Sequence, residues 1–452
     1  MGKQMPGGRT STRFTSAGQQ YDHGCQFFRA SSGPFKRLVR EWLQAGVIAE
    51  WKPRLGVYDA TTGSFKKRED LGPAEAAAAG SGFFDALSPT AGPMFVGQPS
   101  METVVAHVLE QCPAAGAGPG LELGEGWEAE GGNTLRLNTR VHKARWSEGK
   151  WHLAGERVQL DSNGGIDPCL PSGEAWNLGV FDALVLADSQ VAKPGSHGHI
   201  TFETPPASLR ELQRQLTGLS RVPLFSLLVG WPPNAAGALL PGDAVQVVGG
   251  QAVQWVANDT SKPGRKRTDG MTCWVAVTRP DFAARLVGAS PGKALAGLPQ
   301  AGPEYNAKKA QEIWTAMQSD LRAAMGIRPL NRPKYLSAHR WGSAYVTNPL
   351  GQPAVSDVDS RWAACGDFCL GAGVESAAIS GASAADAVAN MLGLPPATPA
   401  AGAAAGLGMQ GSKGGKEGGK DGLAHSHSTG EAGLRAGLGG RLTASGPSMH
   451  RR

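Results

Sequence analysis

Two short glycine-rich turns near opposite ends of the chain carry residue types suited to binding a phosphate-bearing ligand. The first is Gly7-Gly8-Arg9. A pair of glycines lets the backbone approach a bulky anion because no Cβ stands in the way. Arg9 adds a planar fork of donors that matches phosphate oxygens. The sequence therefore predicts a phosphate-facing turn at this point.

The second turn, Gly366-Asp367, follows the short apolar segment Trp362–Cys365 and precedes a run of small residues from Val374 to Leu392. This order predicts a strand, an acidic turn, a glycine loop and a helix whose N-terminus can face a polar or anionic ligand. The alternative is an ordinary crossover between a strand and a helix, which needs no ligand. The pattern by itself leaves both interpretations open.

The helices and strands that position these turns are predicted from the spacing of apolar residues. A helix is expected over residues 34–49, ended by Gly46. Another is expected over 99–110, with Ser100 as its N-cap. Strands are expected over 135–141, 151–153 and 181–187, the last buried on both faces of a sheet, and inserted loops over 112–132 and 161–177.

The middle of the chain is rich in strand patterns. Apolar runs predict strands over 223–229, 253–257, 273–277 and 334–340, and helical spacing predicts a helix over 306–325. We therefore expect a β-rich unit that is distinct from the α/β segments on either side.

The β-rich unit and the first turn carry side chains that suit a binding site. His339 could act as a base, although a hydrogen-bonded structural histidine is the common alternative in a strand. His23 lies beside a turn, where capping or packing is the expected role. Trp255 and Trp341 could equally belong to the core. The basic segment Lys262–Arg267 is expected to be a solvated loop tip, or else to attract an anionic dinucleotide.

Composition separates the end of the chain from the rest. The 452 residues carry a formal net charge of +6, and residues 395–452 are rich in Ala and Gly with seven Lys or Arg against three acidic residues. Such a segment has too little apolar surface to offset its ordering entropy, so we expect a disordered tail. The basic balance is mostly a property of this tail, and no basic face with interleaved aromatic residues indicates nucleic-acid binding.

Other classes of site and of protein are not indicated. The six cysteines form no C-x-x-C pair, which fits buried thiols or a reducing compartment rather than zinc ligation. No apolar run approaches the ~20 residues of a membrane-spanning helix. The sequence also lacks a Ser-His-Asp or Cys-His arrangement for nucleophilic catalysis.

Four segments, taken with the opening turn and in this order, resemble the flavin amine oxidase superfamily and, more closely, its renalase-like branch. They are Tyr21–Phe28, Trp255–Arg265, Ala338–Trp341 and Gly366–Gly371. The resemblance covers about residues 5–392. It implies a Rossmann-like FAD-binding domain of the α/β class and a β-rich, α+β substrate domain. The FAD-binding domain would comprise residues 1–30, 88–190 and 356–394, the substrate domain residues 31–87 and 191–355, and the tail residues 395–452.

The resemblance implies which residues contact the cofactor, FAD. Gly7, Gly8 and Arg9 would face its pyrophosphate, and Gly366 and Asp367 would hold the ribityl and pyrophosphate region.

Further contacts are implied along the rest of the cofactor. Gly24 and Gln26 would lie beside the flavin ring, and the backbone of Val141 would contact the adenine end. Val374 and Glu375 would begin the helix whose N-terminus faces the pyrimidine edge of the flavin, where it stabilises the reduced form.

The β-rich unit would roof the flavin and bind a small-molecule substrate. Asn258, His339 and Trp341 would reach the site from this unit and, with Gln26, form the implied catalytic set. The implied reaction is hydride transfer from an amine or an aberrant dihydronicotinamide to FAD, with reoxidation by oxygen to hydrogen peroxide. The closeness of the renalase-like motifs favours the dihydronicotinamide.

One part of the family pattern is absent. The sequence lacks the βαβ unit with the G-x-G-x-x-G loop and the Glu that binds the adenosine ribose. We therefore expect an N-terminally truncated FAD-binding domain in which neighbouring strands expose unpaired edges. The alternative function is a non-catalytic remnant that binds no FAD and acts at most as an interaction module.

Overall fold

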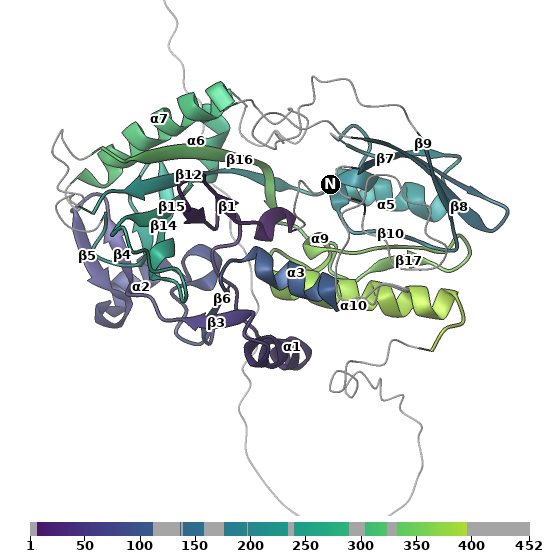
Figure 1. The fold of residues 1–452 in the computed structure, drawn as a ribbon, viewed down its shortest axis with the longest axis horizontal. Helices are drawn as coiled ribbons and strands as arrows, with labels where there is room; N and C mark the ends of the chain where they lie inside the picture. The colour runs from purple at the N-terminus through teal and green to yellow at the C-terminus, as the bar shows by residue number, and fades with distance from the viewer. Residues whose placement is uncertain are drawn as a thin grey trace, which may run out of the picture. The chain divides into compact units, whose positions relative to one another are not determined.

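The computed structural model describes residues 7–111, 136, 139–157, 176–196, 198–233, 239–288, 303–322 and 332–395. These residues belong to one unit, Met1–Ala404. They form a mixed α/β fold, as the sequence predicts (Figure 1). The predicted tail, except residue 395, and the predicted loop at 112–132 lie outside the described residues, as does most of the predicted loop at 161–177.

The largest sheet has seven strands in the order β16-β12-β15-β14-β13-β4-β5. Neighbouring strands are antiparallel except β13 and β4, which are parallel. The strands are β4 (Leu55–Asp59), β5 (Ser64–Lys67), β12 (Arg221–Trp231), β13 (Ala244–Val248), β14 (Val253–Asn258), β15 (Thr272–Thr278) and β16 (Tyr335–Val346). Strands β12, β14, β15 and β16 contain nearly all residues of the four strands expected in the β-rich unit.

One face of this sheet packs against α6 (Pro280–Leu286) and α7 (Pro303–Asp320), which lie beside β12 and β16 in Figure 1. Ile313, Trp314 and Met317 of α7 share one buried cluster with Trp231 of the sheet. Their spacing of one, three and four residues puts them on a single helix face. The helix begins three residues before the predicted start.

On the other face of the sheet, Trp255 belongs to a buried cluster that also contains Phe35, Val39 and Trp42 of α1 (Gly33–Gln44). The predicted helix over 34–49 is too long. The chain turns at Gly46, whose φ of +71° is left-handed, and Ile48 begins β3 (Ile48–Trp51). Strand β3 pairs with β6 (Met94–Gly97).

The predicted helix over 99–110 is α3 (Glu102–Glu110), and its N-cap is Met101 rather than Ser100. The side chain of Ser100 bonds with that of Thr103. The remaining elements are short, namely η1 (Gly8–Thr10), β1 (Arg13–Phe14), β2 (Gln20–Tyr21), η2 (Arg68–Asp70), α2 (Pro73–Ala79), η3 (Phe83–Asp85) and η4 (Asp259–Ser261).

A three-stranded sheet, in the order β10-β18-β17, carries the second glycine turn. Its strands are β10 (Leu184–Leu186), β17 (Val355–Asp357) and β18 (Trp362–Ala364), and β10 and β18 run parallel. After β18 the chain passes through α9 (Asp367–Leu370) into α10 (Val374–Met391), which confirms the predicted order of strand, turn and helix.

The prediction of one fully buried strand over 181–187 is wrong. Phe181 is the last residue of β9 and is exposed, whereas β10 is only three residues long and leaves Val185 45% exposed. Among the described strands β10 pairs only with β18.

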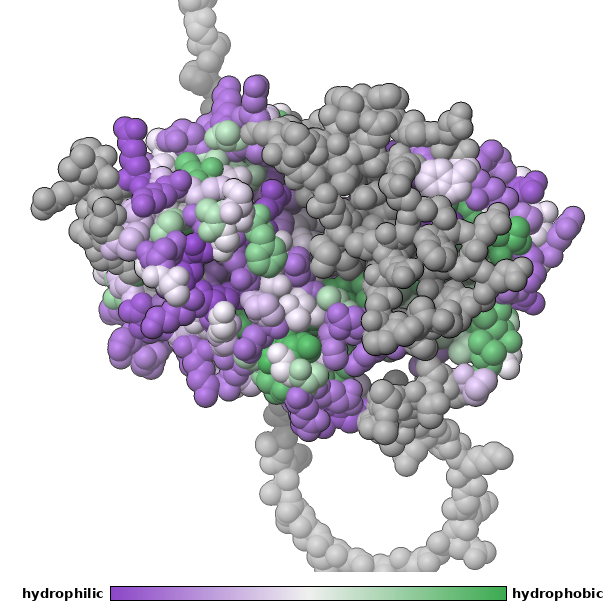
Figure 2. Space-filling view, in the orientation of Figure 1, coloured by the Kyte–Doolittle hydropathy of each residue, from purple (hydrophilic) through white to green (hydrophobic). Residues whose placement is uncertain are grey.

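A four-stranded sheet, β11-β7-β8-β9, lies beside the three-stranded one. Its strands are β7 (Thr139–Ser147), β8 (Lys150–Arg157), β9 (Trp176–Phe181) and β11 (Thr201–Glu203). Leu209, Leu212 and Leu216 of α5 (Ala207–Thr217) join Trp151 of β8 and Trp362 of β18 in one buried cluster, which ties the two sheets together. Figure 2 shows hydrophobic residues at the surface on the right of the view, where Figure 1 has β8 and β9.

Candidate functional site

The two glycine turns meet in space. The guanidinium of Arg9 donates to both carboxylate oxygens of Asp367, at 2.6 and 2.7 Å, and also to the backbone oxygen of Ala344 at 2.9 Å. Burial lowers the pKa of Arg9, but the Asp367 carboxylate outweighs it and the pKa is raised. This bidentate pair joins residues 358 positions apart, so the two motifs form one site.

Gly24 fits closely against the first turn. The amide of Cys25 donates to the backbone oxygen of Arg9 at 2.7 Å. A Cβ on Gly24 would fall on that carbonyl group, 2.9 Å from its carbon, and would lie 3.1 Å from Cζ2 of Trp341. Only glycine permits this approach of two backbones, and the contact brings Gly24, Arg9 and Trp341 together.

A buried ion network holds the turn that carries Gly24. The Asp22 carboxylate accepts from Nζ of Lys262 at 2.8 Å and from the guanidinium of Arg265, and Thr12 donates to its other oxygen at 2.7 Å. Asp259 accepts from the amide of Asp22 at 2.6 Å and pairs with Lys262 at 2.6 Å. Segments 12–22 and 259–265 are thereby fixed to each other.

The network corrects the prediction that Lys262–Arg267 is a solvated loop tip. The side chains of Lys262 and Arg265 are 0% and 2% exposed, because each neutralises a buried carboxylate. Burial raises the pKa of Asp22, but the charges of Lys262 and Arg265 outweigh it and hold the pKa at about 2. Burial raises the pKa of Asp259.

The rings of His23, His339 and Trp341 pack together, with both histidines buried and Trp341 partly exposed. The His339 ring lies 4.6 Å from the His23 ring and 4.3 Å from the Trp341 ring, measured between centroids. Nε1 of Trp341 donates to the backbone oxygen of His23 at 3.0 Å, and the Ser226 hydroxyl donates to the same oxygen. Two of the four implied catalytic residues, His339 and Trp341, are therefore in contact.

Asn258 and Gln26 occupy different places. Asn258 ends β14, separated from β16 by strands β12 and β15, and its side chain bonds with Asp243 and with the amide of Thr260. At about 4.8 Å per strand, this puts its backbone roughly 14 Å from that of β16. The structure therefore does not bring Asn258 to His339. Gln26 is buried and donates to the backbone oxygen of Asp22, so it braces its own turn, while its Oε1 has no hydrogen-bond partner among the described residues.

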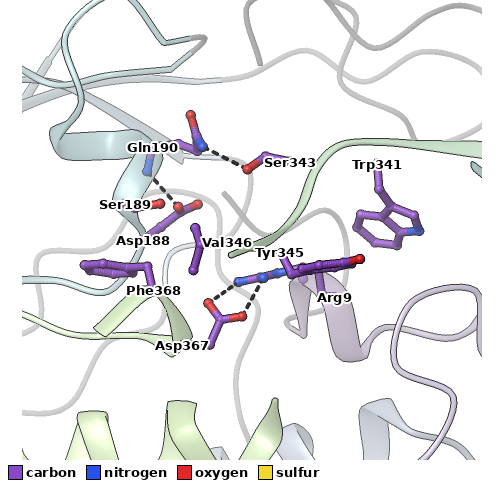
Figure 3. Close-up of a pocket in the computed structure, with 11 residues that line it drawn as sticks. Arg9, Asp188, Ser189, Gln190, Trp341, Ser343, Tyr345, Val346, Asp367 and Phe368 are labelled. Carbon is purple, nitrogen blue, oxygen red and sulfur yellow. Dashed lines mark hydrogen bonds and ion pairs between the residues drawn. The ribbon is translucent and has the colours of Figure 1, made fainter. Parts of the chain in front are cut away.

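A cavity of about 210 Å³ opens where the two turns meet (Figure 3). Figure 3 shows its two sides, with Asp188, Ser189 and Gln190 on one and Trp341 and Tyr345 on the other. Arg9 and Asp367 lie between them, and Gly8, Ser343, Val346 and Phe368 complete the lining. Burial raises the pKa of Tyr345.

Several lining residues were not singled out in the sequence. Asp188 and Gln190 follow the apolar run that ends in β10, and polar residues at the carboxyl end of a parallel strand are a known signal for a ligand site. Asp188 accepts from the amide of Gln190 at 2.8 Å and so caps α4 (Ser189–Ala192). No sequence pattern singles out Ser343 and Tyr345, because they lie within the long strand β16 and next to no turn or glycine motif.

The remaining implied cofactor residues lie away from the cavity lining. Glu375, in the first turn of α10, accepts from the amides of Ser31 and Ser32 and from the Ser31 hydroxyl. Burial raises its pKa, but these hydrogen bonds outweigh burial and lower it. Val374 packs against the aromatic cluster around α1, and Val141 packs in the cluster of the four-stranded sheet. Gly7 precedes η1 with a φ of +138°.

The donor set fits one part of a dinucleotide. A Cβ on Gly8 would meet no atom within 4 Å, so its backbone is open to an anion, and the Arg9 side chain is 44% exposed. The cavity is smaller than the ~300–1,000 Å³ of pockets for drug-sized ligands. The residues therefore fit the pyrophosphate part of FAD, whereas the cavity as it stands does not hold the whole cofactor.

Other site classes find no support in the described part of the chain. Those residues include no group of three His, Cys, Asp or Glu placed to hold a metal ion. No described helix is long and apolar enough to cross a membrane. The cysteines at 25, 273, 365 and 369 are free thiols, and those at 112 and 169 lie outside the described residues.

Comparison with known proteins gives a likeness at the level of solved structures. No protein-family model matches the chain. Cyclohexylamine oxidase from Brevibacterium oxydans IH-35A is 14% identical, with a TM-score of 0.47, and the match covers 86% of this chain and 92% of that one. Wild-type putrescine oxidase bound to putrescine is 12% identical, with a TM-score of 0.45 and coverages of 85% and 92%.

Proposed function

We propose that the chain is an FAD-dependent oxidoreductase that oxidises a small reduced nitrogen compound. One observation carries this proposal. The Gly8-Arg9 and Gly366-Asp367 turns, which resemble the two halves of the cofactor site in renalase-like flavoproteins, lie at one cavity and are joined by a bidentate ion pair.

The chain's own residues would bind the cofactor and orient the substrate beside it. Gly8 and Arg9 would hold the pyrophosphate, with Asp367 fixing the Arg9 guanidinium in place. Gly24 would let the flavin-side turn approach, and Trp341 with His339 would form the wall against the substrate. FAD, when bound, supplies the hydride acceptor, and oxygen returns it to the oxidised form with release of hydrogen peroxide.

The domain division follows from the same proposal. Residues 1–30, 88–190 and 356–394 would bind the cofactor, and residues 31–87 and 191–355 would bind the substrate. The seven-stranded sheet supports this division, because all its strands come from the two segments assigned to the substrate domain.

Either of two substrates fits the proposal, an amine or an aberrant dihydronicotinamide, and the renalase-like motifs favour the second. The test is to purify the chain, release any bound flavin by denaturation and measure its absorbance. Hydrogen peroxide formation is then assayed with benzylamine, putrescine and an isomeric dihydronicotinamide dinucleotide. A chain that retains no FAD when FAD is added during refolding would contradict the proposal.

A second function is favoured by the cavity volume of about 210 Å³. So small a cavity is expected of a non-catalytic remnant that holds no FAD and serves at most as an interaction module. The flavin measurement separates the two functions, because a remnant is folded but colourless. Circular dichroism of the same sample shows whether the chain is folded.

A further inference from the structure

Two neighbouring parallel strands each deliver an aspartate to the edge of the sheet where the cavity opens. Leu186, the last residue of β10, pairs with Ala364, the last residue of β18. Asp188 and Asp367 follow shortly after these two ends, and both line the cavity. The two carboxylates therefore border the same space at the carboxyl ends of the strands, where ligands bind in folds of this class.

The two carboxylates differ in what they already bind. Both oxygens of Asp367 accept from the Arg9 guanidinium, so its charge is neutralised. One oxygen of Asp188 accepts from the amide of Gln190 at 2.8 Å, and its other oxygen accepts no hydrogen bond from any described residue. Since Arg9 is the one cation among the described lining residues, Asp188 keeps an acceptor available for a donor on a ligand.

Gln190 links Asp188 to a hydroxyl group on a different element. Its backbone amide donates to Asp188, and its side-chain amide donates to Oγ of Ser343 in β16 at 3.2 Å (Figure 3). Ser343 also lines the cavity, and its hydroxyl donates to no other described residue. One residue thus positions an acceptor and a donor at the same cavity.

A hydroxyl group is the ligand that matches this pair. It can donate to the Asp188 carboxylate and accept from the Ser343 hydroxyl at the same time. A phosphate offers only acceptors and carries negative charge, so it is repelled by Asp188 and suits Gly8 and Arg9 instead. Sugar hydroxyls that adjoin the phosphates of a nucleotide satisfy both requirements.

We propose that Asp188 and Ser343 bind sugar hydroxyls of the nucleotide whose phosphates lie at Gly8 and Arg9, with Gln190 as their positioning residue. The proposal rests on the proposed function, which supplies the nucleotide, and adds the residues that hold its sugar. FAD carries such hydroxyls on both sides of its pyrophosphate, on the ribose of the adenosine half and on the ribityl chain of the flavin half. The two sources share one chemistry, and the experiment separates them.

The experiment compares nucleotides that differ only in these hydroxyls. ADP is paired with 2′,3′-dideoxy-ADP, and FMN is paired with its analogue that carries a pentyl chain in place of the ribityl chain. Titration calorimetry on the purified full chain gives the affinity ratio within each pair. We expect the hydroxyl-bearing member of at least one pair to bind about tenfold more tightly, and that pair identifies the half of FAD. Equal affinities within both pairs would overturn the proposal.

Asp188→Ser removes the free oxygen and keeps a side chain that can cap α4 (Ser189–Ala192). If Asp188 binds the sugar, the affinity ratio falls close to one in this variant. If Asp188 only faces the phosphates, the loss of its negative charge tightens both members of a pair by the same factor and the ratio persists. A persistent ratio would overturn the proposal.

Two further variants separate hydrogen bonding from charge. Ser343→Ala leaves every charge in place and should lower the ratio about threefold. Asp182→Ser removes an exposed carboxylate that pairs with Lys150 outside the cavity lining, and it should leave the ratio unchanged. An unchanged ratio in Ser343→Ala, or a ratio that Asp182→Ser also abolishes, would contradict the assignment. Circular dichroism of each variant shows that it is folded.

Flavin retention tests the proposed function separately. A chain that retains FAD, and whose Asp188→Ser variant retains it equally tightly with no preference for the hydroxyl-bearing probes, would keep the proposed function and lose this inference. A chain that prefers ADP over its dideoxy analogue but retains no FAD would lose the proposed function and keep the sugar site for another nucleotide.

Discussion

Asp22 is the residue on which the turn beside the cavity depends. Its carboxylate is fully buried and neutralises Lys262 and Arg265. Asp22→Asn would leave two buried cations facing Asp259 alone. We expect the free energy of unfolding, measured by urea denaturation, to fall by about 3–5 kcal/mol. The control is Asp269→Asn, which removes an exposed carboxylate from a surface ion pair with Arg267 and should cost much less. Equal costs in the two variants would contradict the importance of the buried network.

The same carboxylate gives a pH dependence. The pKa of Asp22 is lowered from 3.8 to about 2 in the folded chain, because Lys262 and Arg265 outweigh the effect of burial. A lowered pKa contributes stability that is present above the unfolded value and is lost as the pH falls through the folded value. The difference in unfolding free energy between the parent chain and Asp22→Asn should therefore shrink between pH 4 and pH 2. A difference that stays constant down to pH 2 would refute the prediction.

Gly24 gives a third test at the residue scale. In Gly24→Ala the new methyl group would collide with the Arg9 carbonyl, which is backbone and cannot swing away. Overpacking of this kind costs about 1–3 kcal/mol, and it should also move Arg9 and lower flavin retention.

Gly381→Ala, in α10 with no atom within 4 Å of the new Cβ, is the matched control and should stabilise the chain by about 0.5–1 kcal/mol. The experiment is a comparison of urea midpoints, and a Gly24→Ala variant as stable as the parent would show that the two backbones can separate.

At the scale of elements, a carboxylate in the first turn of α10 forms hydrogen bonds to the start of α1. Glu375 accepts three hydrogen bonds from Ser31 and Ser32, where Ser32 is the N-cap of α1. Glu375→Ala removes all three, but Ser31 is exposed and water can replace its partner, so we expect a loss of about 1 kcal/mol. Asp386→Ala, on the exposed side of α10, should cost less than about 0.5 kcal/mol. Hydrogen exchange should show faster opening of α1 and α10 in Glu375→Ala alone, and uniform exchange would argue against a local fastening.

For the whole molecule, the sequence predicts elements better than contacts. The strands of the β-rich unit and the order of strand, turn and helix at Trp362–Met391 follow from local apolar patterns, and the structure contains them. The burial of Lys262 and Arg265 could not be predicted, because their partner Asp22 is about 240 residues away and a basic run by itself resembles a surface loop. Strand β10 is shorter than predicted because burial on both faces depends on neighbouring strands, which the pattern at 181–187 does not specify.

The contact between Arg9 and Asp367 can be measured as a coupling across nearly the whole described chain. Arg9 is 44% exposed and Asp367 11% exposed, so the pair is partly screened by water, but its geometry is bidentate. A double-mutant cycle of Arg9→Ala, Asp367→Asn and the double variant should give a coupling free energy of about 1 kcal/mol in urea denaturation. The coupling should fall at high salt because part of the pair is exposed. Additive effects of the single substitutions would mean that each turn is positioned independently by its own sheet. The ion pair would then not be needed to form the cavity between the turns.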